Sequence, residues 1–255
     1  MGTGITESLY HSKNVSDQAK YAYRKGVGLI PSSEYAVYFN DFFENPSSNA
    51  IPGTTAVIDT GATATAANAA AIGYNGAIDI TSDGTTEGVA MYWPLNVQLG
   101  NDKKFVMEVR VYTEDADDTD VQFGLSALTA TTNPEDLWTT TATDLIAFGV
   151  LDGDATPTML CDKDNSGSSA ETASGTDYDL SDATWHTLAI EVGGSATDSS
   201  MYVKGYVDGK LAVTWSTETT IPDDLPLAPF IGARTGGDAA HNVYYDYVRW
   251  AVSRS

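Results

Sequence analysis

The sequence predicts an all-β protein, built as a two-sheet antiparallel jelly-roll sandwich behind a short N-terminal arm. Short runs of alternating apolar and polar residues recur along the chain, turn residues separate them, and no long helical pattern interrupts them. The chain has 255 residues, of which 42% are hydrophobic, enough for the core of one large β domain. We therefore expect an anchoring arm at 1–34 and a jelly-roll domain at 35–255.

The arm differs from the rest of the chain in charge and in pattern. Its first 30 residues sum to +2, whereas the remaining residues sum to −24. Ser16 can cap a short helix that Gly26 would end. We expect the arm to bind an acidic partner, and a solvated tail is the alternative. The predicted contact residues are Lys13, Lys20, Tyr21, Tyr23, Arg24 and Lys25.

Strand patterns begin at Tyr35 and fill the first half of the domain. In the clearest of them, Phe105 and Met107 point to one side and Glu108 and Arg110 to the other. Residues 61–71 are small and fit either a loop or a flat, closely packed strand. The predicted strands of this half are 35–39, 55–58, 72–81, 88–93, 104–112 and 121–125.

The second half contains the most regular pattern of the chain, a three-stranded meander from Trp185 to Trp215. Its second and third strands flank the turn Asp208-Gly209, a residue pair that favours tight hairpins. The predicted core faces are Leu188, Ile190 and Val192, then Val203 and Val207, then Leu211, Val213 and Trp215. The other predicted strands of this half are 145–151, 158–161, 229–234 and 243–252.

The segment Trp185-His186-Thr187-Leu188-Ala189-Ile190, followed by Val207-Asp208-Gly209-Lys210, resembles the concanavalin A-like lectin/glucanase superfamily, including laminin-G-like domains. The final run at 245–250 resembles the last strand of that fold, which commonly pairs with an early strand such as the one near Tyr38. The resemblance covers most of residues 35–255. It implies a fold and says almost nothing about function.

A second resemblance concerns the whole chain, which is similar to virion structural proteins of tailed phages that decorate capsids or form head fibres. The charged arm, Asn40-Asp41-Phe42-Phe43 and the strand at 104–112 with its Asp-rich turn carry this resemblance. It implies assembly inside a host cell, with the major capsid protein or other virion proteins as partners and self-association into a homo-oligomer.

Catalysis by paired carboxylates is not expected. Glycosidases of this superfamily carry E-x-D-x-x-E on one strand, because one carboxylate is the nucleophile and another the acid. No such triplet occurs, and Glu108 and Glu191 each stand without a second acid on their strand face. His11, His186 and His241 lie in separate predicted elements, and none has a second His, Cys or Glu at metal-ligand spacing.

One loop has the beginning of a calcium-binding pattern. Asp162, Asp164 and Ser166 place oxygen atoms at alternate positions before Gly167, as in D-x-[DN]-x-S-G. The twelfth position is Ala173, where a full calcium loop has Glu, so an Asx-rich turn is the alternative. The acidic run Glu114–Asp120 fits a solvated hairpin tip, with an interfacial cation as its alternative. No other cofactor is expected.

Composition excludes several classes of partner. With 35 acidic and 13 basic residues the net charge is −22, so nucleic acid is not an expected partner. Cys161 is the single cysteine, and no apolar run is long enough to cross a membrane. We find no signal-peptide pattern and expect synthesis in a host cytoplasm and residence in the virion.

We therefore expect a non-enzymatic virion structural protein, a capsid decoration or head-fibre protein attached through its arm. The alternative is a lectin-like module that binds a surface glycan, with or without calcium. Tyr244, Tyr245 and Tyr247 alternate along the last strand, so at least one should face solvent, where it can stack on a sugar or seal an interface. A polysaccharide-degrading enzyme is the third and weakest alternative.

Overall fold

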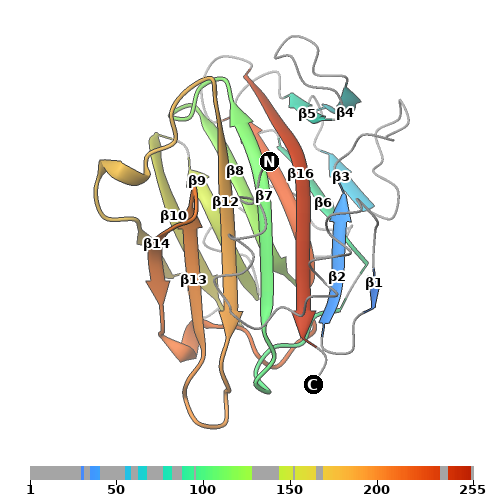
Figure 1. Cartoon of the computed structure of the whole chain (residues 1–255), viewed down its shortest axis with the longest axis vertical. Coiled ribbons are helices and arrows are strands. Elements are labelled where there is room, and N and C mark those ends of the chain that lie inside the picture. Colours follow the sequence, from blue (N-terminus) through green and yellow to red (C-terminus); the bar gives the residue numbers. More distant parts are fainter. Residues whose placement is uncertain are drawn as a thin grey trace, which may run out of the picture.

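A computed structural model gives the architecture, which is a sandwich of two antiparallel sheets (Figure 1). The structure describes 30–31, 35–40, 55–58, 63–67, 77–81, 88–94, 96–127, 144–151, 153–164, 169–235 and 241–253. Within these ranges no helix is long and apolar enough to span a bilayer. The all-β jelly roll expected from the sequence is confirmed.

The first sheet has nine strands among the described residues and contains the meander. Its main order is β1-β2-β16-β7-β12-β13-β14, while β5 pairs with both β16 and β4. The bounds are Ile30–Pro31 (β1), Tyr35–Asn40 (β2), Thr63–Ala67 (β4), Ala77–Thr81 (β5), Phe105–Thr113 (β7), Thr184–Gly193 (β12), Tyr202–Val207 (β13), Lys210–Trp215 (β14) and Asn242–Ser253 (β16).

The second sheet has seven strands among the described residues, in the order β11-β10-β9-β8-β15-β6-β3. In the described part of the chain, two short 3-10 helices, Thr176–Tyr178 and Glu218–Thr220, lie in connections. The strand bounds are Thr55–Ile58 (β3), Gly88–Tyr92 (β6), Thr119–Ser126 (β8), Leu145–Leu151 (β9), Asp154–Asp162 (β10), Ser169–Thr172 (β11) and Ala228–Thr235 (β15).

The core lies between the two sheets and comes from alternate residues of their strands. Phe105 and Met107 of β7 meet Phe123 of β8 and Phe148 of β9 in this layer, and all four are fully buried. Alternation puts every second side chain of a strand on one face, so these strands each supply a row of apolar residues. Tyr245 also crosses the layer, and its hydroxyl donates to the Gly232 carbonyl at 2.7 Å.

The meander predicted at 185–215 is confirmed as β12-β13-β14, with one correction. Asp208 and Gly209 both have positive φ, 49° and 78°, as the tight turn requires. Val213 and Trp215 are buried as expected, but Leu211 is 46% exposed. The pairing skips one residue of β14, because Gly205 faces Val213 while Tyr206 faces Leu211. This bulge turns Leu211 away from the core face.

The last strand pairs with an early strand, as predicted, and Trp250 lies opposite Tyr38 with the two rings stacked. A register shift between Tyr245 and Tyr247 puts Tyr247 on the outer face together with Tyr244. All three tyrosines are buried, so the expectation that one faces solvent is wrong. Strict alternation would put Tyr245 and Tyr247 on the same face of β16, and the register shift between them puts them on opposite faces.

Candidate functional site

The fully buried charges of the nine-stranded sheet lie on its outer face and are paired with each other. Glu108 of β7 and Arg249 of β16 are opposite each other in the register and form an ion pair, with both side chains 0% exposed. The Tyr247 hydroxyl donates to Glu108 Oε1 at 2.7 Å. A carboxylate held in this way has its charge balanced within the sheet and, being fully buried, lies out of reach of a substrate in solvent.

Other carboxylates within strands are held in similar ways. Asp120 of β8 is paired with Arg234 of β15, its cross-strand neighbour. Glu191 of β12 accepts from the Tyr202 hydroxyl at 2.8 Å, and burial together with the Glu191 charge raises the pKa of Tyr206. Asp120 therefore has a cationic neighbour and Glu191 a phenolic neighbour on its own sheet face.

A strand-borne pair of catalytic carboxylates is absent from the described strands. None of them carries two Asp or Glu residues two positions apart, so no two acids stand side by side on one strand face. Glycoside hydrolysis by two carboxylates needs both acids to flank one bond. The strand faces that are described do not supply that arrangement.

A group of three carboxylates does form at one end of the seven-stranded sheet. Asp144 precedes β9, Asp164 follows β10 and Asp224 precedes β15, and one oxygen of each lies within 4.8 Å of the others. The Asp164 amide donates to Asp144 Oδ1 at 3.2 Å, which fixes the buried member of the group. Carboxylate oxygens are the kind of donor that a hard cation such as Ca²⁺ prefers, although Ca²⁺ takes about six to eight oxygen ligands and would need others besides these three.

The electrostatics of this group favour a cation. Burial raises the pKa of Asp144. The Asp164 amide and the Lys163 charge oppose that shift, whereas the charges of Asp164 and Asp224 add to it. Lys163 is paired with Asp223, the neighbour of Asp224, and this contact raises the pKa of Lys163. A divalent ion among the three carboxylates would relieve their mutual repulsion.

The structure places two of the three predicted calcium-binding residues in different surroundings. Asp164 belongs to the three-carboxylate group, while Asp162 is buried at the end of β10, opposite Leu145, and is not a member. Ser166 lies outside the described residues, so the predicted set of three stays a prediction. Asp144 and Asp224 were not predicted, because they are distant in sequence and only the fold brings them to Asp164.

The predicted partner-binding residues of the arm, Lys13, Lys20, Tyr21, Tyr23, Arg24 and Lys25, also lie outside the described residues. The division into an arm and a domain at residue 34 therefore stays a prediction.

An aromatic group lies on the outer face of the nine-stranded sheet. Trp185 and Tyr112 are cross-strand neighbours with ring centroids 5.5 Å apart, and Tyr244 packs edge-on against Tyr112. The Arg110 guanidinium lies 4.9 Å from the centre of the Trp185 ring. Trp185 and Tyr112 are partly exposed, so this group, rather than Tyr244 alone, offers an aromatic surface on which a ligand can stack.

His186 has a structural role in the hairpin that follows it. Its Nδ1 lies 2.8 Å from Asp208 Oδ2, and its Nε2 accepts from the Ser181 amide at 3.0 Å. Asp208 also accepts from the Thr187 amide, so it links β12 to the turn after β13. In this protein, the sequence motif that carries the lectin/glucanase resemblance therefore holds the end of β13 and its turn against β12.

Comparison with known proteins shows similarity in fold alone. The sequence matches no protein-family model and no curated protein sequence. A protein of unknown function from Shewanella oneidensis MR-1 has a TM-score of 0.58 at 11% identity, covering 94% of this chain and 95% of the other. The carbohydrate recognition domain of Emp47p has a TM-score of 0.56 at 13% identity, with coverage of 87% and 98%.

An endo-1,3-beta-glucanase from Streptomyces sioyaensis is similar to the same extent, with a TM-score of 0.54, 13% identity, and coverage of 88% of this chain and 98% of the other. The chain thus has the jelly-roll fold of the concanavalin A-like lectins and glucanases, as the sequence resemblance implied. One fold serves sugar-binding and sugar-cleaving proteins, so it does not decide between them.

Proposed function

We propose that this protein is a non-enzymatic structural protein of a tailed-phage virion, a capsid decoration or head-fibre protein. The observation that carries the non-enzymatic part is the pairing of Glu108, Asp120 and Glu191 within the strands, above all Glu108 with Arg249, both 0% exposed. Acids that are buried and have their charge balanced inside the sheet are not available to a substrate. The virion assignment rests on the sequence resemblance, which is carried by the charged arm, the segment at 40–43 and the strand at 104–112 with its Asp-rich turn.

Charge supports attachment through the arm. The first 30 residues carry +2, and the rest of each chain carries −24. Opposite charges attract an arm to an acidic surface, while the bodies of neighbouring copies repel each other. The arm can thus bind a shell protein or the body of a sister subunit, and either contact gives an assembled particle coat.

The arm is tested by a charge-reversed pair in the full chain, Lys20→Glu with Arg24→Glu. We expect at least a tenfold loss of copies that co-sediment with tailed-phage heads assembled without this protein, because the attraction becomes repulsion. The matched control is Lys103→Glu with Lys210→Glu, which makes the same charge change on the body and should leave binding intact. Equal binding by both variants would reject attachment through the arm.

A second function, cation-dependent carbohydrate binding, is favoured by the group of Asp144, Asp164 and Asp224. Lectins use this fold, and the Emp47p domain is named for carbohydrate recognition. We expect a glycan array to be negative under the structural proposal. Chelator-sensitive binding that Asp164→Asn with Asp224→Asn abolishes, but the exposed control Asp177→Asn preserves, would favour the lectin function instead.

The enzymatic alternative is tested with the same protein. Incubation with β-glucans and acidic polysaccharides should release no reducing ends and no unsaturated sugars. Turnover that is lost in Asp144→Asn would contradict the non-enzymatic assignment and would identify the three-carboxylate group as the reacting site.

A further inference from the structure

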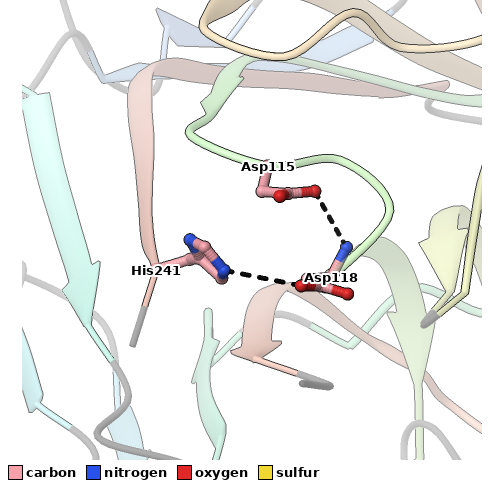
Figure 2. A group of neighbouring side chains, drawn as sticks. All are labelled: Asp115, Asp118 and His241. Carbon is pink, nitrogen blue, oxygen red and sulfur yellow. Dashed lines mark hydrogen bonds and ion pairs between the residues drawn. The ribbon is translucent and has the colours of Figure 1, made fainter. Parts of the chain in front are cut away.

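A second group of candidate metal ligands lies at the other end of the sandwich and contains a histidine. Asp115 and Asp118 belong to the turn between β7 and β8, and His241 precedes β16 (Figure 2). One ligand atom of each lies within 4.8 Å of the others. The eight residues of β8 separate this end from the Asp144 group by roughly 25 Å at about 3.3 Å per residue, so the two groups are independent.

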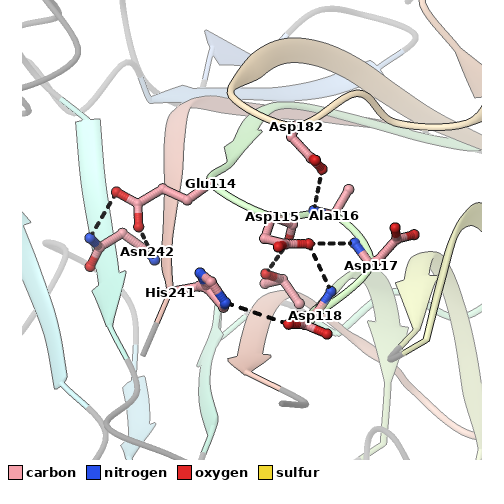
Figure 3. Close-up of polar contacts among 9 residues, drawn as sticks. Glu114, Asp115, Ala116, Asp117, Asp118, Asp182, His241 and Asn242 are labelled. Carbon is pink, nitrogen blue, oxygen red and sulfur yellow. Dashed lines mark hydrogen bonds and ion pairs between the residues drawn. The ribbon is translucent and has the colours of Figure 1, made fainter. Parts of the chain in front are cut away.

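The turn holds Asp115 in a fixed orientation. Its Oδ1 accepts from the amides of Asp117 and Asp118, at 3.1 and 3.2 Å (Figure 3). Its carbonyl accepts from the Thr119 hydroxyl, and Asp182 accepts from the Ala116 amide at 2.9 Å. Both of these amide hydrogen bonds are accepted by Asp115 Oδ1, so they leave Oδ2 of the same carboxylate for a ligand. The site therefore needs little rearrangement to bind an ion.

His241 is fixed beside this turn by its neighbour. Asn242 donates from its amide and its side chain to the Glu114 carboxylate, both at 3.0 Å (Figure 3). The Asn242 carbonyl also accepts from the Glu114 amide at 3.2 Å. The His241 side chain is 19% exposed, but its Nε2 is buried and has no hydrogen-bond partner in the described part of the chain. That atom lies 3.7 Å from Asp118 Oδ2, beyond hydrogen-bond range.

We propose that Asp115, Asp118 and His241 bind a divalent first-row transition metal of the Zn²⁺ class. Imidazole nitrogen with two carboxylate oxygens is a donor set for such ions, whereas the all-oxygen Asp144 group suits Ca²⁺. Coordination gives the buried Nε2 the partner it lacks among the described residues, and two carboxylates balance the charge of the ion. With three protein ligands, a fourth position stays open to water or to a partner's side chain.

The distances fit an ion of this size. Tetrahedral Zn²⁺ with bonds of about 2.1 Å holds its ligands about 3.4 Å apart. His241 and Asp118 are already near that separation, at 3.7 Å. No two ligand atoms of the group are more than 4.8 Å apart, so each pair has to close by at most about 1.4 Å, which side-chain rotation provides. Bound metal would join the β7–β8 turn to the start of β16, two segments far apart in the sequence.

The test is calorimetric titration of the chelator-treated full chain with ZnCl₂, together with the visible absorption of bound Co²⁺. We expect one ion per chain at this site and at least a tenfold weaker affinity in His241→Ala and in Asp118→Asn. Matched controls remove the same side chains elsewhere, as His11→Ala and Asp177→Asn, and should bind like the parent. Circular dichroism checks that each variant is folded.

Three results would overturn the site. They are no binding of Zn²⁺ to the parent, Zn²⁺ binding that His241→Ala leaves unchanged, or a Co²⁺ absorption spectrum that shows no nitrogen ligand. Titration of Asp164→Asn with Asp224→Asn separates the two ends, because that variant should keep its Zn²⁺ affinity. Saturating Zn²⁺ should also raise the unfolding temperature of the parent but not of His241→Ala, since a ligand stabilises only the state that binds it. This inference does not depend on the virion assignment.

Discussion

At the scale of single residues, the most consequential feature is a buried ion pair in a strongly acidic protein. Glu108 and Arg249 connect β7 to β16, adjacent strands in the middle of the nine-stranded sheet. Taking both charges out of water is costly, and the cost is offset only while each has the other and the Tyr247 hydroxyl. Replacing only one residue of the pair should therefore lower the free energy of unfolding more than replacing both with apolar residues.

We predict that Arg249→Met lowers the free energy of unfolding by about 3–5 kcal/mol, because it leaves the Glu108 charge in the sheet without its cation. The double variant Glu108→Leu, Arg249→Met should recover most of that loss. Arg110→Met is the control, since Arg110 and Asp246 are partly exposed at 29% and 21% and such pairs contribute about 1 kcal/mol or less. Urea denaturation measures all three, and similar losses for Arg249→Met and Arg110→Met would contradict the prediction.

At the scale of elements, alternation predicted the strands and most of their faces, but not the bulges. Val203, Val207, Val213 and Trp215 lie in the core as expected. Leu211 does not, because the extra residue in β14 depends on how β13 pairs with it. The register shift before Tyr247 is of the same kind. A bulge belongs to two strands at once, so one strand's own pattern does not contain it.

The candidate metal groups show the same limit. The loop pattern pointed to Asp164, whose carboxylate does join a group, but Asp144 and Asp224 come from other strand ends. In the sequence, His241 has no second metal-binding residue at a typical ligand spacing. The pairing of β16 with β7 brings it to the acidic turn between β7 and β8. Spacing reveals ligands on one element, whereas these groups form where several elements end.

The hairpin turn after β13 gives a pH dependence at this scale. Burial alone would raise the pKa of Asp208, but hydrogen bonds from His186 and the Thr187 amide lower it overall. A carboxyl whose pKa is lower in the folded state adds stability above its unfolded pKa, about 3.9, and loses it as the pH falls through the folded value. Asp208 is half-exposed, so the contribution is about 0.5 kcal/mol.

We therefore predict that Asp208→Asn, which keeps the turn preference, is less stable than the parent at pH 5 and above. The difference should shrink as the pH falls below the unfolded pKa of about 3.9, and it should be lost once the pH passes the lowered pKa of Asp208 in the folded state. Denaturation curves across this range measure it. The exposed control Asp177→Asn should show no such convergence. A difference that stays constant down to low pH would mean that the charge of Asp208 contributes nothing to the hairpin.

At the scale of the whole molecule, charge is the dominant property. A net charge of −22 and a sequence pI of about 4.1 come with acids gathered at both ends of the sandwich, in the Asp144 group and in the turn at 114–118. Like charges on a folded body repel more strongly than in an expanded chain, so they oppose folding. The paired acids within the strands are shielded from salt, while the exposed ones at the ends are not.

Salt should therefore stabilise this protein. With chelator present to remove divalent ions, raising NaCl from about 20 mM to about 500 mM at pH 8 shortens the screening length severalfold and weakens the repulsion among exposed acids. We expect a higher unfolding temperature, by about 2–4 °C for each 1 kcal/mol of repulsion relieved. At pH 4.1 the net charge is close to zero and the same change in salt should have little effect. If the unfolding temperature instead falls with salt at pH 8, then attractive pairs such as Arg110 with Asp246 outweigh the net repulsion, and the acidity does not limit the stability of the fold.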